Sequence, residues 1–272
     1  ESSDIRVFSD DEYKNVGLKV TKDVEDCDVF LGVKEVPVNA LISNKKYFFF
    51  SHTIKKQPYN RKLLQAILRK NIDLYDHETI VKENGARLIG FGRYAGIVGA
   101  YNGFRAIGLK NNSFNLPKAE TLNSQKELIE ELRKVKLSNI KIVLTGNGKV
   151  AYGAKEMLDA MQIKKVAVEE YLVKTFNEPV YCFIDVLDYN KRKDGLVINN
   201  KDFYNNPKEY KSDFMRFAKV SDFFIAGHYY GDDAPYLFTR EDAKKEDFKI
   251  KYVADISCDI NGPVASTIRP ST

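Results

Sequence analysis

A short apolar run that leads directly into a glycine-rich turn is the feature of this sequence that most restricts its fold. Residues Ile140–Leu144 are predicted to form a buried strand, and Val150–Met161 are predicted to form a helix. Between them, Gly146, Gly148 and Ala151 match the pattern G-x-G-x-x-G/A. The first glycine of this pattern makes a tight turn, the second admits a pyrophosphate, and the small third residue lets the helix approach the strand. The turn therefore predicts a dinucleotide site.

The start of the helix supports this prediction, because its free N–H groups and its positive dipole end attract phosphate. An acidic residue about twenty positions further on should bind the adenosine ribose. Glu169 and Glu170 lie near that distance, behind the apolar run 166–168. This spacing favours NAD, but two candidate carboxylates and an unclear strand end leave NADP open. The alternative interpretation is a strand–helix turn that uses glycine for packing alone.

The first 110 residues alternate short apolar runs with a helical pattern. Predicted strands are Asp28–Val33, Tyr47–Phe50 and Ile72–Tyr75, and Arg61–Leu68 have the apolar spacing of a helix. Continuous apolar runs are typical of parallel strands covered on both faces, and strand, helix and strand in turn indicate a βαβ unit. The first part of the chain is therefore predicted to be an α/β domain.

A second α/β pattern follows a connector rich in Asn, Ser, Thr and Pro at residues 110–123, after which Ser124–Glu127 match a capping box. A length of 272 residues suits two domains of about 150 residues each, so we expect domains at 1–123 and 124–272. Further predicted strands of the second domain are Val180–Ile184, Phe223–Ala226 and Tyr252–Ile256. Residues 187–219 are polar and aromatic-rich, which predicts an insertion or an irregular cap.

The composition argues against several classes of protein. Lys and Arg number 43 and Asp and Glu 38, and this excess of +5 is spread along the chain, so no nucleic-acid partner is expected. No apolar stretch reaches the roughly 18 residues of a spanning helix, so no membrane partner is expected either. The three cysteines lie far apart without metal-ligand spacing, which predicts no metal and a reducing, cytoplasmic setting. The oligomeric state is not determined by these features.

Polar side chains follow the predicted strands of the first domain. Lys34 and Glu35 follow the first strand, His52 follows the second, and residues 76–78 follow the third. Since the carboxyl ends of parallel strands meet at one edge of a sheet, Lys34 and His52 should face the same crevice if their strands are neighbours. A lysine near other cations and a histidine both exchange protons near neutral pH. The cluster therefore predicts acid–base chemistry, and ordinary surface groups are the alternative for each residue.

The two remaining histidines are assigned no function. His77 is expected to face solvent, and His228 is expected to pack among Tyr229 and Tyr230.

Several segments of the chain, in order, resemble the saccharopine dehydrogenase family, which is related to alanine dehydrogenase and to the transhydrogenase N-terminal domain. Phe30–Pro37, Phe49–Lys55 and Gly92–Gly96 carry the resemblance in the first half. In the second half, Thr145–Val150 and Asp255–Asp259 are most similar to the lysine–2-oxoglutarate reductase branch.

The resemblance implies two Rossmann-like domains, with parallel sheets flanked by helices and an active-site cleft between them. It implies a reversible NAD- or NADP-linked reaction that joins the ε-amine of lysine to 2-oxoglutarate through an imine, or splits saccharopine. The residue roles that it implies are acid–base catalysis by Lys34 and His52, pKa tuning by Glu35 and Glu78, and substrate-carboxylate binding by Arg87. Lys55 and Arg93 are further candidates for substrate binding, because a substrate with several carboxylates needs cationic partners. Together with the glycine turn, the resemblance gives the candidate cofactor residues Gly146, Gly148, Lys149, Val150, Glu169 and Asp255.

Two other functions stay open. One is an alanine-dehydrogenase-like enzyme that acts on a different amino acid, and the other is a non-catalytic NAD(H)-binding module. Members of the family usually carry a further strand with a substrate arginine before the position of Glu1, and more chain after Thr272. The resemblance implies that substrate turnover depends on such segments too.

Overall fold

The computed structural model describes residues 7–56, 58–231, 233–258 and 262–269. The chain divides into two compact units, unit 1 (Glu1–Gly90) and unit 2 (Phe91–Thr272). The sequence predicted the boundary between residues 123 and 124, whereas the structural division lies earlier, between Gly90 and Phe91. The reason is helix α3 (Gly92–Asn111), which packs against α5 (Lys149–Ala160) and therefore belongs to unit 2.

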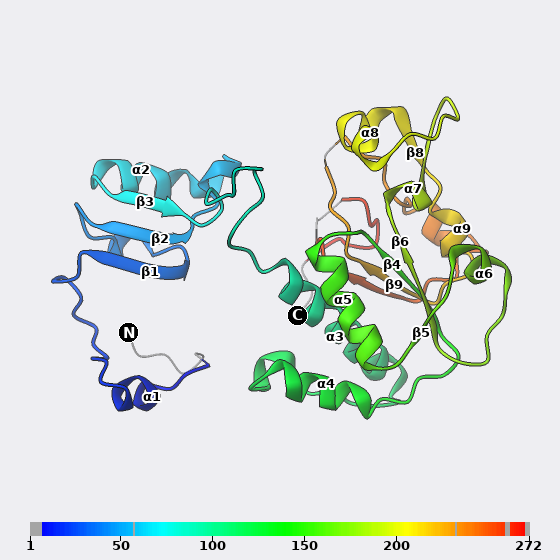
Figure 1. Cartoon of the computed structure of the whole chain (residues 1–272), viewed down its shortest axis with the longest axis horizontal. Helices are drawn as coiled ribbons and strands as arrows, with labels where there is room; N and C mark the ends of the chain where they lie inside the picture. Colours follow the sequence, from blue (N-terminus) through cyan, green and yellow to red (C-terminus); the bar gives the residue numbers. More distant parts are fainter. Residues whose placement is uncertain (1–6, 57, 232, 259–261, 270–272) are drawn as a thin grey trace. The chain divides into compact units, whose positions relative to one another are not determined.

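Unit 1 contains a three-stranded parallel sheet in the order β1-β2-β3, with helix α2 as the crossover between β2 and β3 (Figure 1). The bounds are β1 Val29–Lys34, β2 Lys46–Phe50, α2 Arg61–Arg69 and β3 Asp73–Asp76, and each lies within one residue of its prediction. The other helical segments are α1 Asp10–Asn15 and 3₁₀ turns at Val38–Ala40, Thr53–Lys55 and Pro58–Asn60. The predicted βαβ unit is therefore present.

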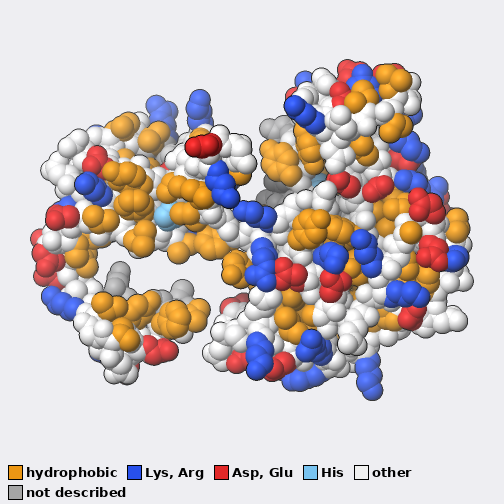
Figure 2. All heavy atoms as spheres, in the orientation of Figure 1, with side chains coloured by type: hydrophobic (Ala, Val, Ile, Leu, Met, Phe, Trp, Pro, Cys, Tyr) orange, Lys and Arg blue, Asp and Glu red, His pale blue; other side chains and the backbone are white. Residues whose placement is uncertain are grey.

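One face of this sheet packs on α2, and its core residues are Leu41, Tyr47, Phe49, Leu63, Ala66, Ile67 and Ile72. The side chains of β1 alternate, so that Phe30 stacks on Tyr47 while Leu31 points to the other face and is 80% exposed. Figure 2 shows hydrophobic side chains gathered over the strands of unit 1. Within the described residues, unit 1 thus buries one face of its sheet. The continuous apolar runs of its strands had predicted that both faces would be buried.

Unit 2 contains a five-stranded sheet in the order β10-β9-β4-β6-β5, and every pairing in it is parallel. The strands are β4 Lys141–Thr145, β5 Lys164–Lys165, β6 Val180–Ile184, β9 Phe223–Ala226 and β10 Tyr252–Asp255. The remaining helices of its two layers are α4 Gln125–Arg133, α6 Val168–Val173, α7 Val186–Tyr189 and α9 Met215–Ala218. The predicted α/β class, with parallel sheets flanked by helices, is confirmed.

Both faces of this second sheet are buried. Ile142 and Leu144 of β4 pack in a core with α3, α4 and α5, whereas Val143 packs in the opposite core with α6, α7 and α9. This two-sided burial explains the continuous apolar runs of β4, β6 and β9. The same arrangement brings the carboxyl ends of these three strands to one edge of the sheet.

Helix α3 was not predicted, because five of its 20 residues are glycine and glycine weakens helices in isolation. Its glycines serve close packing instead. A Cβ on Gly96 would lie 1.9 Å from the carbonyl oxygen of Val150, and a Cβ on Gly153 of α5 would lie 2.0 Å from that of Arg93. Tertiary packing of α3 on α5 therefore overrides the low helix propensity.

The predicted insertion at residues 187–219 contains short elements. They are the antiparallel pair β7 (Asn190–Arg192) and β8 (Tyr210–Ser212), helix α8 (Asn200–Asn205), the whole of α9 and all but the first residue of α7. 3₁₀ turns at Ala119–Thr121, Pro207–Glu209 and Asp242–Lys244 complete the unit. Across the described ranges, no helix combines the length and apolar character that crossing a membrane requires.

Candidate functional site

The glycine turn of unit 2 lies where β4 ends and α5 begins, as the sequence predicted. Gly146 has a φ of +104°, and a Cβ there would lie 2.7 Å from the carbonyl oxygen of Gly227. Its N–H donates to the carbonyl oxygen of Ile184, and the N–H of Gly227 donates to that of Thr145. The turn is thereby tied to the ends of both neighbouring strands, β6 and β9.

Gly148 differs from Gly146 in its surroundings. Its backbone is extended, and a Cβ built on it would meet no atom within 4 Å. Its small size is therefore not required by packing within the chain. An open position at this point of the pattern is what close approach of a pyrophosphate needs.

A cavity of about 540 Å³ opens above the turn. Its walls are residues 146–150, Tyr189 and Tyr204, residues 227–230, and Ser257. This volume lies within the range of about 300–1,000 Å³ of small-molecule sites, and the start of α5 presents unpaired N–H groups to it. Among the predicted cofactor residues, Gly146, Gly148, Lys149 and Val150 all border the cavity. The residues present thus fit a dinucleotide.

Asp185 is the acidic residue that the sheet order places beside the glycine turn, and the sequence analysis missed it. It directly follows β6, the neighbour of β4, and its Oδ2 accepts a hydrogen bond of 3.1 Å from the side chain of Asn147 in the turn. Its carboxylate also accepts from the Val186 N–H at 2.7 Å and from Asn200 at 2.6 Å. The Asp188 N–H of the α7 capping box is a further donor to this carboxylate, so a ribose hydroxyl would share or replace one of about four accepted hydrogen bonds.

The predicted ribose carboxylate, Glu169, lies elsewhere. It is an exposed residue in the first turn of α6, after edge strand β5, and, like Asp185, it is not among the residues that border the cavity. The expectation of a ribose carboxylate about twenty residues after the turn assumes that the second strand of the domain is the neighbour of the first. Here the sheet order places β6 between β4 and β5, so the strand beside the turn is the third one along the chain.

Asp255, at the end of β10, is not among the residues that border the cavity, but it binds one of them. Its carboxylate accepts hydrogen bonds from the hydroxyls of Ser257 at 2.6 Å and Thr267 at 2.5 Å. Ser257 is the member of this group that borders the cavity.

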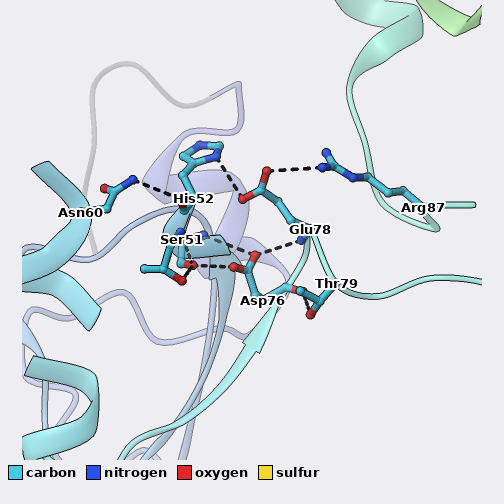
Figure 3. A network of polar contacts seen from close by, with 8 residues as sticks. Ser51, His52, Asn60, Asp76, Glu78, Thr79 and Arg87 are labelled. Atoms are coloured by element: carbon cyan, nitrogen blue, oxygen red, sulfur yellow. Dashed lines mark hydrogen bonds and ion pairs between the residues drawn. The ribbon is translucent and has the colours of Figure 1, made fainter. Parts of the chain in front are cut away.

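The polar cluster of unit 1 is formed by side chains that follow β2 and β3 (Figure 3). The buried Glu78 has one oxygen 3.2 Å from Nδ1 of His52 and the other 3.6 Å from a guanidinium nitrogen of Arg87. The contact with His52 has the distance of an ion pair without the alignment of a hydrogen bond. Glu78 therefore orients a half-exposed histidine and an exposed arginine at the same edge of the sheet.

A second carboxylate, Asp76, holds the loop that carries His52. It accepts hydrogen bonds from the Ser51 hydroxyl and from the Glu78 N–H, the latter at 2.9 Å. His52 has a φ of +55°, and Asn60 donates to its carbonyl oxygen at 3.2 Å. The backbone around His52 is thus fixed in a left-handed conformation that is uncommon outside glycine.

The strands that carry Lys34 and His52 had to be neighbours for the two side chains to lie at one edge of the sheet. They are, because β1 pairs with β2 and Lys34 is in register with Phe50. Lys34 and Glu35 are exposed at this same edge of the sheet. The side chain of Lys55 lies outside the described part of the structure.

Arg93 has a different environment from Arg87. It lies on α3 in unit 2, where Glu156 accepts two of its hydrogen bonds, at 2.7 and 2.6 Å. This bidentate pair joins α3 to α5, which gives Arg93 a structural role besides the predicted contact with substrate.

Two histidines differ from their predicted environments. His77 is buried instead of solvent-facing, and its Nε2 lies 3.1 Å from the carbonyl oxygen of Gly32. His228 is buried against Tyr189, while Tyr229 is 82% exposed. In the described residues, no group of three or more His, Cys, Asp or Glu side chains is arranged to hold a metal ion.

Comparisons with known proteins agree with the motifs. Residues 1–98 match the family model of the alanine dehydrogenase/PNT N-terminal domain. The mitochondrial alpha-aminoadipic semialdehyde synthase of Mus musculus is 29% identical over 267 residues, which cover 90% of this chain and 29% of that protein. The L-lysine-forming, NAD(+) saccharopine dehydrogenase of Yarrowia lipolytica is 24% identical over 281 residues, which cover 97% of this chain and 67% of that protein.

The chain thus spans under a third of the mouse protein and about two thirds of the yeast one. Among solved structures, an L-alanine dehydrogenase superposes with a TM-score of 0.51 at 15% identity, covering 87% of this chain and 58% of that chain. This last likeness shows a shared fold. Taken together, the matches confirm the predicted resemblance: residues 1–98 match the alanine dehydrogenase/PNT N-terminal domain, and the chain as a whole is similar in sequence to saccharopine dehydrogenases and alpha-aminoadipic semialdehyde synthases.

Proposed function

We propose that the chain is an NAD-dependent oxidoreductase of the saccharopine dehydrogenase type, which joins the ε-amine of lysine to 2-oxoglutarate or reverses that reaction. The observation that carries the proposal is the cavity above the glycine turn, with an open position at Gly148 and Asp185 bound to Asn147. The names of the relatives, which are saccharopine dehydrogenases and alpha-aminoadipic semialdehyde synthases, support the choice of substrates.

Asp185 supports NAD over NADP. A carboxylate beside the turn accepts hydrogen bonds from the ribose hydroxyls of NAD, and it repels the 2′-phosphate of NADP. No described arginine or lysine is hydrogen-bonded to Asp185, whose partners are Asn147, Asn200 and the N–H groups of Val186 and Asp188.

The polar cluster of unit 1 is proposed to perform the proton transfers and to bind substrate carboxylates. His52 and Lys34 take a proton from the ε-ammonium of lysine and later return one to the departing hydroxyl when the imine forms. Glu78 keeps His52 oriented through Nδ1, which leaves Nε2 for the substrate. The exposed guanidinium of Arg87 binds a carboxylate of 2-oxoglutarate.

When a nicotinamide dinucleotide is bound, it supplies the hydride that reduces the imine or accepts the hydride in the reverse direction. The chain itself positions the cofactor at the glycine turn of unit 2. Glu35 is proposed to tune the acid–base pair, and Lys55 and Arg93 are proposed to bind further carboxylates of the substrate.

A spectrophotometric screen tests the proposal. NADH and NADPH oxidation is measured with 2-oxoglutarate and a panel of amino acids, and then with pyruvate and ammonia. We expect NADH to be consumed only when lysine and 2-oxoglutarate are both present. Consumption with pyruvate and ammonia favours the alanine-type enzyme instead, and NADH binding without oxidation under any condition favours a non-catalytic module.

The compartment is proposed to be reducing, since Cys27 and Cys182 are free thiols and Cys27 is exposed. The mouse relative is named as mitochondrial, so the cytoplasm and the mitochondrion are the two candidates. Subcellular fractionation of the native protein separates them.

A further inference from the structure

His228 occupies the side of the glycine turn that lies opposite to Asp185. It follows β9, which pairs with β4 on the edge away from β6. Only 7% of the residue is exposed, and it borders the cavity above the turn. Its Nδ1 lies 2.7 Å from the hydroxyl of Thr145, the last residue of β4.

Hydrogen-bond accounting assigns the tautomer of this ring. The Thr145 hydroxyl is completely buried and has no second partner among the described residues. If Thr145 donates to Nδ1, its proton is satisfied and the ring carries its own proton on Nε2. If Nδ1 donates instead, both the hydroxyl proton and the Nε2 lone pair are left without partners. The first arrangement leaves fewer buried polar groups unsatisfied, and it makes Nε2–H a donor.

That donor has no acceptor in the part of the chain that the structure describes. Burial also lowers the pKa of His228 to about 4, because the charged form is disfavoured in this environment. The ring is therefore neutral near pH 7 and keeps a single, fixed donor. Buried donors without acceptors are rare in folded proteins, and a ligand oxygen in the adjoining cavity would satisfy this one.

The sheet order indicates which part of a dinucleotide would meet this donor. A dinucleotide lies across the carboxyl edge of the sheet, with its pyrophosphate at the glycine turn. Asp185 lies on the β6 side of the turn, where the adenosine ribose is expected, so the β9 side receives the nicotinamide half.

We propose that His228 is a cofactor-binding residue whose Nε2–H donates a hydrogen bond to an oxygen on the nicotinamide half of the dinucleotide. This assignment rests on the proposed dinucleotide site. The acceptor is an oxygen of the nicotinamide ribose or of the carboxamide group, and both are uncharged acceptors that suit a neutral donor.

Two substitutions separate the two sides of the ring. His228→Asn keeps an amide near the position of Nδ1, within reach of Thr145, but it removes the donor at Nε2. His228→Gln extends an amide N–H toward the position of Nε2. Isothermal titration calorimetry with NADH, ADP-ribose and ADP then compares each variant with the parent chain, which contains no tryptophan for fluorescence quenching.

We expect His228→Asn to weaken NADH binding about tenfold, the effect of one neutral hydrogen bond, while ADP binding stays unchanged and His228→Gln recovers part of the loss. A matching loss for ADP-ribose assigns the acceptor to the ribose, and an unchanged ADP-ribose affinity assigns it to the carboxamide. Equal losses for NADH and ADP, or no loss at all in a folded His228→Asn variant, overturn the proposal.

Failure of the proposed function gives a different result. If the parent chain binds neither NADH nor NADPH, the dinucleotide site itself is refuted and the role of His228 falls with it. Nitrogen chemical shifts of the parent chain give a check that needs no variant, because the sequence has three histidines. A proton on Nε2 of His228, with a shift that moves on adding NADH, supports the proposal; a proton on Nδ1 overturns it.

Discussion

The glycine turn of unit 2 and the polar cluster of unit 1 both lie at the carboxyl ends of parallel strands, yet they are assembled from different parts of the chain. The turn presents mainly backbone, because its glycines and the start of α5 leave N–H groups open to the cavity. The cluster presents side chains from separate loops, in which Glu78 holds His52 and Arg87. We therefore expect NADH binding at the turn to be lost when a side chain is added there. We expect turnover to be lost when a side chain of the cluster is removed.

The largest expected effect is in unit 1. We predict that His52→Ala lowers kcat about a thousandfold, since a positioned acid–base group contributes on the order of 10²–10⁴ in rate. The dissociation constant for NADH should change less than twofold, because His52 belongs to the other unit from the glycine turn. Stopped-flow turnover and calorimetry measure the two quantities. Equal losses in turnover and NADH affinity would argue against a proton-transfer role.

In unit 2, Gly148→Val should weaken NADH binding at least a hundredfold, because the new side chain would enter the open space above the turn. The fold should survive, since the backbone of Gly148 is extended and no neighbour crowds its Cβ position. Gly90→Val is the matched control, because a Cβ at Gly90 also meets no atom within 4 Å. A variant that stays folded and binds NADH normally would exclude the turn as the phosphate site.

The sequence predicted the glycine turn more completely than it predicted the cluster, and the reason is locality. The turn is one continuous stretch of sequence, so the spacing of Gly146, Gly148 and Lys149 is enough to predict that they lie together. Residues such as Lys34 and His52 could be placed at strand ends, but the contact of Glu78 with both His52 and Arg87 depends on how loops fold.

Two features of unit 2 could not be predicted from local sequence at all. Asp185 lies beside the turn only because β6, and not β5, pairs with β4. His228 and Thr145 are 83 residues apart and meet because β9 pairs with β4. Strand order is a property of the whole domain, so a fixed sequence interval predicts Glu169, whereas the sheet order leads us to propose Asp185.

The burial of His228 predicts how the stability of the folded chain depends on pH. In the unfolded chain His228 takes up a proton below pH 6.5, whereas in the folded protein burial against Tyr189 keeps it neutral until about pH 4, despite the nearby charge of Asp255. Between these values the unfolded state binds more protons, so stability is lost as the pH falls from 6.5 to 4. The loss is about 3 kcal/mol, roughly a hundredfold in the unfolding equilibrium.

Urea unfolding of the parent chain and of His228→Gln, at pH 4.5 and pH 7, isolates this contribution from that of the carboxylates. The free energy of unfolding should fall more steeply in the parent chain. Identical pH dependence in both proteins would mean that His228 is not held neutral by burial.

The smallest effect concerns the choice of cofactor. Asp185→Asn keeps a side chain that caps α7 but removes the charge, so we expect the ratio of NADPH to NADH affinity to rise about tenfold. Glu169→Gln is the matched control and should leave that ratio unchanged. If Glu169→Gln changes the ratio and Asp185→Asn does not, the twenty-residue spacing identified the ribose carboxylate and the sheet-order argument fails.

Hydrogen exchange of the full chain, measured with and without NADH, tests most directly whether the dinucleotide binds at the glycine turn of unit 2. We predict slower exchange of backbone amides at residues 146–150, 185–189 and 227–230 once NADH is added. Unchanged exchange at residues 146–150, with protection confined to other segments, would contradict the assignment of the cofactor site.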